Sequence, residues 1–296
     1  MSKNFNFFAF SAKASTGDSN FKRYIGVAPV RVLAVNPNKQ QLEEIYGNPQ
    51  DNEPTYLGRD EKSGVETARI DFILKTVEEK CGVDTIARVS FFLQNQKLVG
   101  SKTGKIKVID RYGRTAWATQ DEITNHTIPV YSNGPADIDK DYRPAFVGEE
   151  QLITFLKARL GVSNTFTFDK NGNRKPAANM ADCEAYLEHI PDYFKGNYSE
   201  LKELLTYVPN NVVRVLFGIR NAGDNQYQTV YNEYFQKAGA SKNSGFEKNV
   251  NDRKEAGAYP TTEFEFCDIK EYNPAAPTAI EDMPDNINPA DNFFND

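Results

Sequence analysis

Several segments in the first half of the chain alternate between apolar and polar residues, and this pattern strongly limits the fold. Residues 65–75 carry apolar side chains at every second position, with Arg69, Asp71 and Lys75 on the other face. Residues 88–94 repeat the pattern, as do residues 105–109. A period of two is that of a β-strand with one face in a core. The apolar positions are Ala68, Ile70, Phe72 and Leu74, then Val89, Phe91 and Leu93, then Ile106 and Val108.

Further strands are expected on either side of these segments. Residues 24–35 (YIGVAPVRVLAV) are rich in β-branched residues and end at Asn36-Pro37. We expect Asn36 to cap a short helix that has Pro37 at its first position and ends at Gly47. Residues 109–119 (IDRYGRTAWAT) are expected to continue as a straight or bent strand, with Gly113 allowing a bulge or a close approach.

The pattern becomes helical after residue 142. Residues 149–160 (EEQLITFLKARL) carry apolar side chains at helical spacing and are followed by Gly161. Two more helices and three more strands are expected, the helices at 181–190 and 198–205 and the strands at 212–219, 227–235 and 262–267. The last of these strands is predicted to close the sheet. The polar stretch 238–258 is expected to be a flexible loop.

These patterns together predict an α+β fold. We expect an OB-like antiparallel β-barrel core with a helical insertion and a disordered acidic C-terminal tail. The expected organisation is an N-terminal arm at 1–23, the first part of the barrel at 24–141, the helical insertion at 142–208, strands that complete the core at 209–270 with the flexible loop 238–258, and the tail at 271–296.

The tail holds the whole net charge of the protein. The chain has 35 basic and 41 acidic residues, and six of the acidic residues lie between Glu271 and Asp296, where Lys and Arg are absent. The rest of the chain therefore has 35 residues of each sign. The tail is also interrupted by prolines and has too little apolar surface to offset the entropy of ordering it, so we expect it to be disordered.

Three roles are open for this tail, which ends in DNFFND. It is a solvated segment that improves solubility, or a peptide that docks Phe293 and Phe294, flanked by Asp291 and Asp296, in a pocket of a partner. In the third role it folds back on the protein's own binding groove as a mimic of nucleic acid. The two phenylalanines favour docking, because a purely solubilising tail has no need of them.

Metal binding and catalysis lack the residues that they normally require. The chain has two histidines and three cysteines, without a CxxC or HExxH motif and without a glycine-rich phosphate loop. We therefore expect a non-enzymatic protein with no cofactor and no metal. Cys183 and His189 are out of phase for one helix face, and structural roles are expected for both. A pocket with Asp121, Glu122 and His126 would be the best place for an unrecognised enzyme.

The cellular compartment is suggested by the cysteines and by the apolar runs. Cys81, Cys183 and Cys267 are odd in number and far apart, so we expect no disulfide framework and a reducing compartment. No apolar run approaches the length of a transmembrane helix, and the N-terminus lacks the pattern of a signal peptide. We therefore expect the cytoplasm and no membrane partner.

Basic and aromatic residues share the presumed outer faces of the predicted strands. Binding of single-stranded nucleic acid requires flat rings for the bases and cations for the phosphates. The candidate nucleic-acid contacts are Arg88, Phe92, Lys105, Lys107, Arg111, Tyr112, Arg114 and Trp117, with Tyr227, Tyr231, Arg214 and Arg220 on the later strands. Tyr and Phe are also ordinary strand residues, and Lys and Arg keep a solvent face soluble. The neutral body argues against a strongly basic footprint.

Parts of the chain resemble a family of phage proteins. The stretch VRVLAVNPNKQQLEEIYG, followed by EPTYLG and ARIDFILK, is similar to the N-terminal part of proteins encoded by large tailed bacteriophages of gut bacteria. DRYGRTAWATQDE, RPAFVGEEQL and NNVVRVLFGIRN resemble later segments of the same group, so the likeness covers about residues 24–236. Such proteins are taken to be phage single-stranded DNA-binding proteins. The likeness brings no site residues with it.

The tail carries a second resemblance. It is similar to the acidic tails of bacterial and phage single-stranded DNA-binding proteins, which join an OB-fold to a tail that recruits replication and recombination enzymes. This tail has fewer acidic residues and ends in Asn295-Asp296, and a helical segment interrupts the expected barrel.

The two resemblances imply a function in an infected bacterial cell. They imply a protein that binds single-stranded DNA without strong sequence preference, protects it, and recruits DNA replication or recombination proteins through its tail during bacteriophage infection. The alternative is a phage virion structural or packaged cargo protein with no nucleic-acid role. The oligomeric state stays open.

Overall fold

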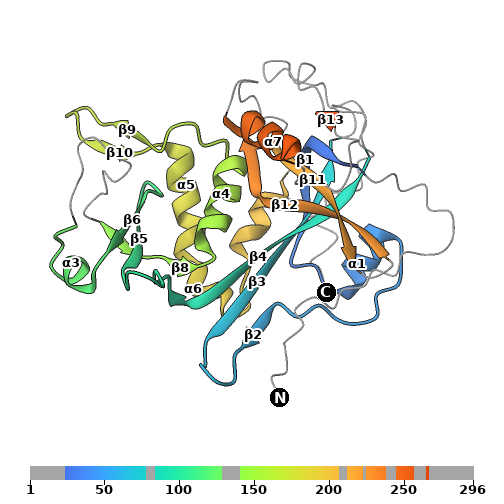
Figure 1. Ribbon diagram of the computed structural model, residues 1–296, viewed down its shortest axis with the longest axis horizontal. Helices are drawn as coiled ribbons and strands as arrows, with labels where there is room; N and C mark the ends of the chain where they lie inside the picture. Colours follow the sequence, from blue (N-terminus) through green and yellow to red (C-terminus); the bar gives the residue numbers. More distant parts are fainter. Residues whose placement is uncertain are drawn as a thin grey trace.

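A strongly curled antiparallel sheet forms the centre of the protein. The computed structural model describes residues 24–77, 84–128, 141–206, 212–222, 225–237, 245–256 and 265–266. Its eight-stranded sheet has the order β12-β11-β1-β3-β4-β8, with β2 beside β3 and the short β13 beside β1 (Figure 1). The strands are β1 (Gly26–Val35), β2 (Leu57–Arg59), β3 (Glu66–Thr76), β4 (Ile86–Lys97), β8 (Phe146–Val147), β11 (Val213–Ala222), β12 (Asn225–Lys237) and β13 (Glu265–Phe266).

Two small sheets and several helices surround the large one. One small sheet has the order β6-β5-β7, and the other is the β9–β10 hairpin. Their strands are β5 (Ile106–Asp110), β6 (Thr115–Ala118), β7 (Tyr142–Pro144), β9 (Phe166–Phe168) and β10 (Arg174–Pro176). The helices are α1 (Lys39–Tyr46), α3 (Gln120–Thr124), α4 (Glu149–Arg159), α5 (Ala178–Glu188), α6 (Ile190–Tyr193), the 3-10 helix η1 (Glu200–Leu205) and α7 (Gly245–Glu255). The predicted α+β class is confirmed.

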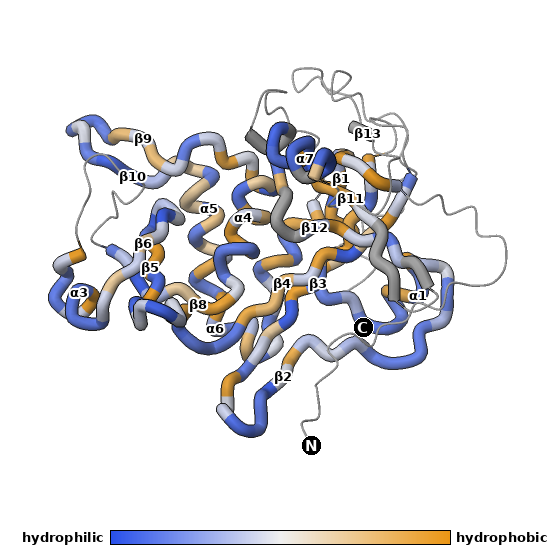
Figure 2. Tube along the Cα trace, in the orientation of Figure 1, coloured by the Kyte–Doolittle hydropathy of each residue, from blue (hydrophilic) through white to orange (hydrophobic). Residues whose placement is uncertain are grey.

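The alternating segments form β3 and β4, as their pattern predicts. The two strands pair antiparallel, with Phe72 opposite Val89 and Ile70 opposite Phe91. These apolar side chains are buried, whereas Phe92 on the other face of β4 is 40% exposed. In Figure 2 the apolar segments gather where the sheet meets the helices, and the outer turns are hydrophilic. Burial of one face against the helices therefore sets the register of the sheet.

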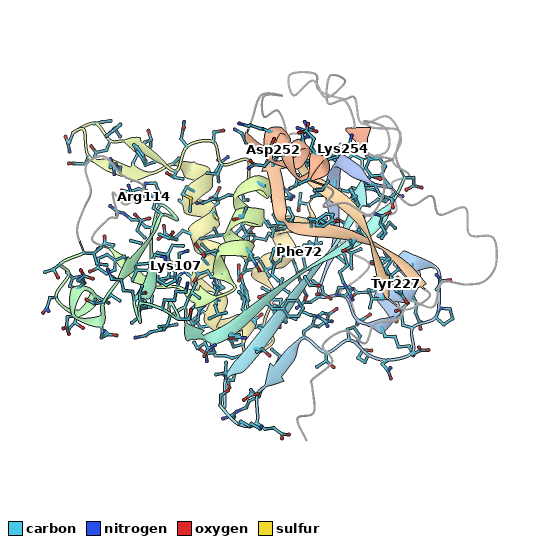
Figure 3. The ribbon with its side chains drawn as sticks, in the orientation of Figure 1. Phe72, Lys107, Arg114, Tyr227, Asp252 and Lys254 are labelled. Atoms are coloured by element: carbon cyan, nitrogen blue, oxygen red, sulfur yellow. The ribbon has the colours of Figure 1, made fainter. Side chains whose placement is uncertain are left out.

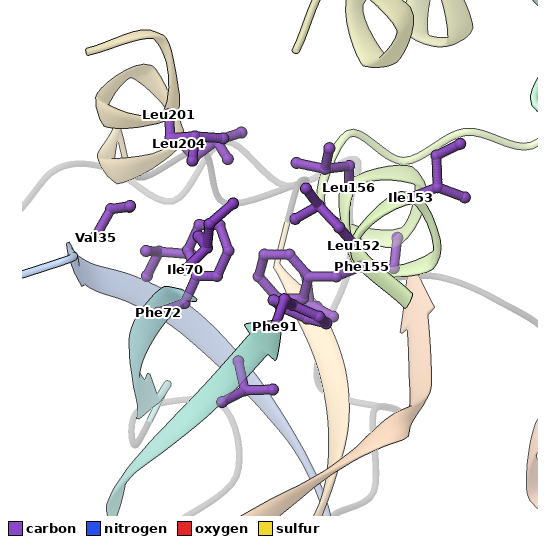
Figure 4. Close-up of a cluster of buried hydrophobic side chains, with 14 of the residues drawn as sticks. Val35, Ile70, Phe72, Phe91, Leu152, Ile153, Phe155, Leu156, Leu201 and Leu204 are labelled. Carbon is purple, nitrogen blue, oxygen red and sulfur yellow. The ribbon is translucent and has the colours of Figure 1, made fainter. Parts of the chain in front are cut away.

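The core lies where α4 meets the two edges of the curled sheet. The Phe235 ring of β12 lies 5.9 Å from the Phe91 ring of β4, so β12 at one edge of the sheet approaches β4, the strand next to β8 at the other edge. Phe155 of α4 contacts both rings, at 5.2 Å and 5.5 Å, and lies 4.6 Å from the Phe72 ring. Figure 4 shows Phe155 beside Phe72 and Phe91. The described strands do not form the closed barrel expected from the sequence, because the side chains of α4 pack where the two edges meet.

The helices of the 142–208 segment cover the inner face of this sheet. Leu152 and Leu156 of α4, Cys183 of α5, and Leu201 of η1 are all fully buried in the same core. α4 ends at Arg159, two residues before Gly161, which has the positive φ expected of a helix stop. The predicted helix at 198–205 is instead the 3-10 helix η1.

The start of α1 differs from the prediction. Asn38, not Asn36, is the N-cap, and its side chain forms a capping box with Gln41. Asn36 has a positive φ of 44°, and its side-chain amide instead binds backbone groups of β3, including the N–H of Asp71. Gly47 ends the helix in the left-handed conformation, as predicted.

Three further predictions need correction. Residues 109–119 form a tight hairpin and not a continuous strand, because β5 ends at Asp110 and β6 begins at Thr115. The expected loop 238–258 contains helix α7. The late strand β13 pairs in parallel with Gly26 and Val27 of β1, and so extends the sheet beside β1 without closing it. The predicted N-terminal arm 1–23 and tail 271–296 lie outside the described residues.

Candidate nucleic-acid interface

Most of the predicted contacts come together on the β5–β6 hairpin. Its turn forms because the Asp110 carboxylate accepts hydrogen bonds from the backbone N–H groups of Tyr112 (2.8 Å) and Arg114 (2.9 Å). Gly113 supplies the positive φ of 65° that the tight reversal needs. An aspartate that binds the next backbone N–H groups is a common way to reverse a chain. The turn therefore brings Lys107 on β5 opposite Trp117 on β6.

Lys107 and Trp117 form a cation–aromatic pair in which the ring is exposed and the lysine side chain is mostly covered. The Lys107 Nζ lies 5.2 Å from the centre of the Trp117 ring, which is 44% exposed. The same amine lies 2.5 Å from Glu150 at the start of α4. Lys105 lies half-buried, one residue before β5. An exposed indole is able to stack a base, and the ammonium group beside it is able to bind the adjoining phosphate.

The turn itself is a packed structure. Tyr112 is fully buried, and the guanidinium groups of Arg111 and Arg114 lie 5.2 Å and 4.6 Å from its ring centre. Arg114 also pairs with Asp110 at 2.7 Å (Figure 3). The Tyr112 hydroxyl donates a hydrogen bond to the carbonyl of Arg174 in the second hairpin. Tyr112 therefore joins the two hairpins and presents no free ring face to a ligand.

Arg88 and Phe92 lie on a different sheet from the hairpin. Both project from β4 on the face that carries Asp71 of β3. Arg88 lies 3.6 Å from the Asp71 carboxylate, which is buried and 3.1 Å from Arg69. The Arg69 guanidinium in turn lies over the Tyr56 ring, at 5.1 Å. Arg88 therefore contributes to a partly buried ion network, and Phe92 is the more accessible of the two predicted contacts.

The β9–β10 hairpin is a basic and aromatic element that the strand patterns missed. Phe168 is 60% exposed, and Lys175, which pairs with Thr167 on the other face of the hairpin, is also exposed. The Arg174 guanidinium lies 4.4 Å from the centre of the Phe166 ring, and that ring is 6.2 Å from Tyr112. Figure 1 places this hairpin at the same end of the molecule as β5 and β6. The alternation in TFTF, followed by the turn sequence DKNGN, was the available signal.

The later strands contribute less to an exposed surface than their sequence suggested. Arg214 is buried and donates a hydrogen bond to Gln236 at 2.7 Å. Tyr231 is partly buried, and its ring lies so close to Gly218 that a Cβ there would be 2.4 Å away. Tyr227, near the start of β12, is partly exposed (Figure 3).

Some predicted positions fall outside the described part of the structure. The side chain of Arg220 is one of them. The tail residues Asp291, Phe293, Phe294 and Asp296 also lie outside the described residues.

In the region suggested for an enzyme site, Glu122 and His126 make structural contacts. Glu122 accepts a hydrogen bond from the Thr119 backbone N–H at 2.7 Å and so caps α3, and this bond holds the pKa of Glu122 below its usual range. His126 packs against the Tyr142 ring, with the ring centres 5.7 Å apart. Within the described ranges, no three His, Cys, Asp or Glu side chains are placed to hold a metal ion.

The other polar candidates for chemistry are packed or paired. Cys183 is fully buried, and burial raises the pKa of its thiol to about 12, so the thiol stays neutral at physiological pH. His189 lies 3.2 Å from the carboxylate of Asp192. Cys183 is therefore a core residue, and His189 is held by a contact with a neighbouring carboxylate.

Comparisons with known proteins identify no family for this chain. The chain matches no protein-family model, no curated protein and no solved structure. In the described part of the chain, the helices are all too short or too polar to span a bilayer.

Proposed function

We propose that this protein binds single-stranded DNA without strong sequence preference and protects it during DNA replication or recombination in a bacteriophage-infected cell. The observation that carries the proposal is the exposed Trp117 ring with the Lys107 ammonium group 5.2 Å from its centre. Stacking tolerates any sequence because every base has a flat face, and the ammonium group binds a phosphate whichever base is attached to it.

The binding surface in this proposal combines the two hairpins. A base stacks on Trp117, and Lys105 and Lys107 bind the adjoining phosphates. Lys107 has three N–H donors, so it is able to keep its contact with Glu150 and still donate to a phosphate. Phe168 on the β9–β10 hairpin offers a second exposed ring, and Arg111 adds positive charge at the turn, where its guanidinium lies against the Tyr112 ring and 3.8 Å from Asp141. Tyr112 supports this surface from beneath.

The curled sheet supports an OB-like assignment as part of the proposal. The strand run β12-β11-β1-β3-β4 is antiparallel throughout, and its two ends approach at Phe91 and Phe235. A small antiparallel barrel with a helix at one opening is the general arrangement of oligonucleotide-binding folds. Here α4 packs where the edge strands meet.

The tail supplies the proposed partner contact. Asp291, Phe293, Phe294 and Asp296 form a short acidic and aromatic peptide next to a body with equal numbers of acidic and basic residues. We assign it to the recruitment of replication or recombination proteins. Replacement of both phenylalanines by alanine should leave oligonucleotide affinity unchanged and abolish capture of those proteins. Tighter DNA binding after truncation at Tyr272 would instead assign the tail as a mimic of nucleic acid.

The decisive experiment is a titration of the full-length protein with oligo-dT at low salt. Trp117 is the only tryptophan in the chain, so its fluorescence reports on this site alone. We expect quenching on binding and an affinity that falls steeply with added salt. Trp117→Ala should weaken binding by about 1–3 kcal/mol, or roughly 5–150-fold. Leu57→Ala is the matched control, because Leu57 is 41% exposed on the distant β2.

Two outcomes would reject this function. The first is an absence of binding at low salt. The second is binding that neither quenches Trp117 nor responds to its replacement, because the strand would then lie elsewhere. High stoichiometric abundance in purified phage particles, together with no DNA affinity, would favour a virion structural or cargo protein.

A further inference from the structure

A cavity lies beside the Trp117 surface, between the β5–β6 turn, α4 and the end of β12. Its volume is about 480 Å³, which is within the usual range of about 300–1,000 Å³ for sites that hold small ligands. Glu150 lines its rim, and the same carboxylate lies 2.5 Å from the Lys107 Nζ. Because Lys107 also contacts the Trp117 ring, the cavity opens next to the proposed stacking site.

The floor and the rim of the cavity differ in chemistry. The floor is apolar and includes Ile153 of α4, Val162 in the following loop and Phe235 of β12. Lys237 and the partly buried Lys157 also line the cavity. The hydroxyl of Ser163 also lies on the rim, where it is exposed. An apolar floor with cationic and hydroxyl donors at one side suits a ligand with a flat ring and an anionic group.

The charges on the rim favour an anion. Lys157 donates a hydrogen bond to the carbonyl of Gly113 at 3.1 Å and has two further N–H donors. Burial lowers the pKa of the Lys157 ammonium group, so a bound anion would relieve part of its desolvation. Lys237 contacts the Ser163 hydroxyl. Among the described residues that line the cavity, Glu150 carries the one carboxylate, and Lys107 already pairs with it.

We infer that this cavity holds one nucleotide of the DNA strand that stacks on Trp117. Its phosphate binds between Lys157 and Lys237, and its base lies on the floor formed by Val162 and Phe235. This inference rests on the proposed function and adds a specific subsite to it. The same chemistry would accept a free nucleoside monophosphate, so the experiment separates the strand from the free nucleotide.

The test measures oligo-dT affinity over a series of salt concentrations for a double variant, Lys157→Gln with Lys237→Gln. We expect binding to weaken about tenfold at low salt, as for the loss of one charge-assisted hydrogen bond. The slope of log affinity against log salt should fall by about 0.7, the value for one phosphate of a single strand. Quenching of Trp117 at saturation should persist, because the stacked base is not touched.

Matched controls exclude a general loss of charge. The variant Lys62→Gln with Lys195→Gln removes the same two charges at exposed positions on other parts of the surface. It should bind with the affinity and salt slope of the wild-type protein. Ser163→Glu places a carboxylate at the exposed rim without removing a packed lysine, and it should weaken binding as the double lysine variant does. Ser199→Glu is the control for this added charge, because Ser199 is exposed at the N-cap of η1.

The outcomes distinguish this subsite from the proposed function. If the wild-type protein binds oligo-dT and quenches Trp117, but the double lysine variant and Ser163→Glu keep its affinity and slope, the subsite is refuted and the function stands. If the wild-type protein binds thymidine monophosphate and not oligo-dT, both the strand subsite and the DNA-binding function are refuted. Unchanged thermal unfolding of each variant shows that the loss is local.

Discussion

Phe155 of α4 packs where β12 and β4 of the curled sheet approach each other. It is fully buried, and its ring contacts the rings of Phe72, Phe91 and Phe235 at centre distances of 4.6, 5.5 and 5.2 Å. Phenylalanine to alanine in a core costs about 3–5 kcal/mol, and each aromatic pair adds about 0.5–1.5 kcal/mol to what burial alone provides. Strands joined by hydrogen bonds collapse poorly into a new cavity. We therefore expect Phe155→Ala to lower the free energy of unfolding by about 4–5 kcal/mol.

Urea unfolding followed by far-ultraviolet circular dichroism measures this loss. A domain of ordinary stability has about 5–15 kcal/mol in total, so the midpoint should move by about a quarter of its value or more. Phe168→Ala is the matched control, because the same atoms are removed from a ring that is 60% exposed. Its effect should stay within about 0.5 kcal/mol.

A cost of less than about 1.5 kcal/mol for Phe155→Ala, or a cost no larger than that of Phe168→Ala, would show that Phe155 does not stabilise the sheet in this way. A double-mutant cycle between Phe155→Ala and Phe235→Leu should also give a coupling energy of about 0.5–1.5 kcal/mol. Additive effects would mean that the two rings do not stabilise the meeting of the sheet edges together.

Two more predictions concern the backbone and pH. Gly148→Ala should destabilise the protein by about 2–4 kcal/mol in the same urea assay, because φ is 86° and the new Cβ would lie 1.9 Å from the Phe92 carbonyl oxygen. Gly172→Ala, at a φ of 80° but with open space around it, should cost only the backbone strain, and equal effects would contradict the steric explanation. The Asn173 backbone N–H holds the pKa of Asp169 below its usual value, so the folded hairpin binds a proton less readily than the unfolded chain. The turn should therefore lose protection as the pH falls through and below the usual pKa range of an aspartate. Amide exchange measured by nuclear magnetic resonance should detect this in the wild-type protein and not in Asp169→Asn; a wild-type turn insensitive to this pH range would contradict it.

Local patterns predicted much of the fold correctly. The alternation around Phe72 and Phe91 identified the buried faces of β3 and β4, and the apolar spacing of residues 149–160 identified α4. Gly47 ended its helix as expected. These features depend on the side-chain period and on backbone conformation within a few residues, so they can be recognised in one segment at a time.

The candidate site was predictable only in part. The residue types around 105–117 indicated a basic and aromatic surface. The prediction of a strand over residues 109–119 was wrong, because Asp110 stabilises a turn there. That turn places Lys107 beside Trp117 on paired strands and buries Tyr112 beneath a second hairpin. The partners of Tyr112 lie far along the chain, at Phe166 and Arg174, so its local sequence held no sign of its burial.

The amino-acid sequence by itself determined which side chains share a strand face, where several helices run, and that the net charge belongs to the tail. What covers each face was decided by tertiary structure. Arg69 and Asp71 stand at the polar positions of β3, yet both are buried, because the chain around α1 packs over that face and the two residues pair with each other. Alternation records the direction of a side chain, whereas burial depends on contacts between distant segments. The exposure of Trp117, the burial of Tyr112 and the cavity beside α4 all depend on such contacts between distant segments.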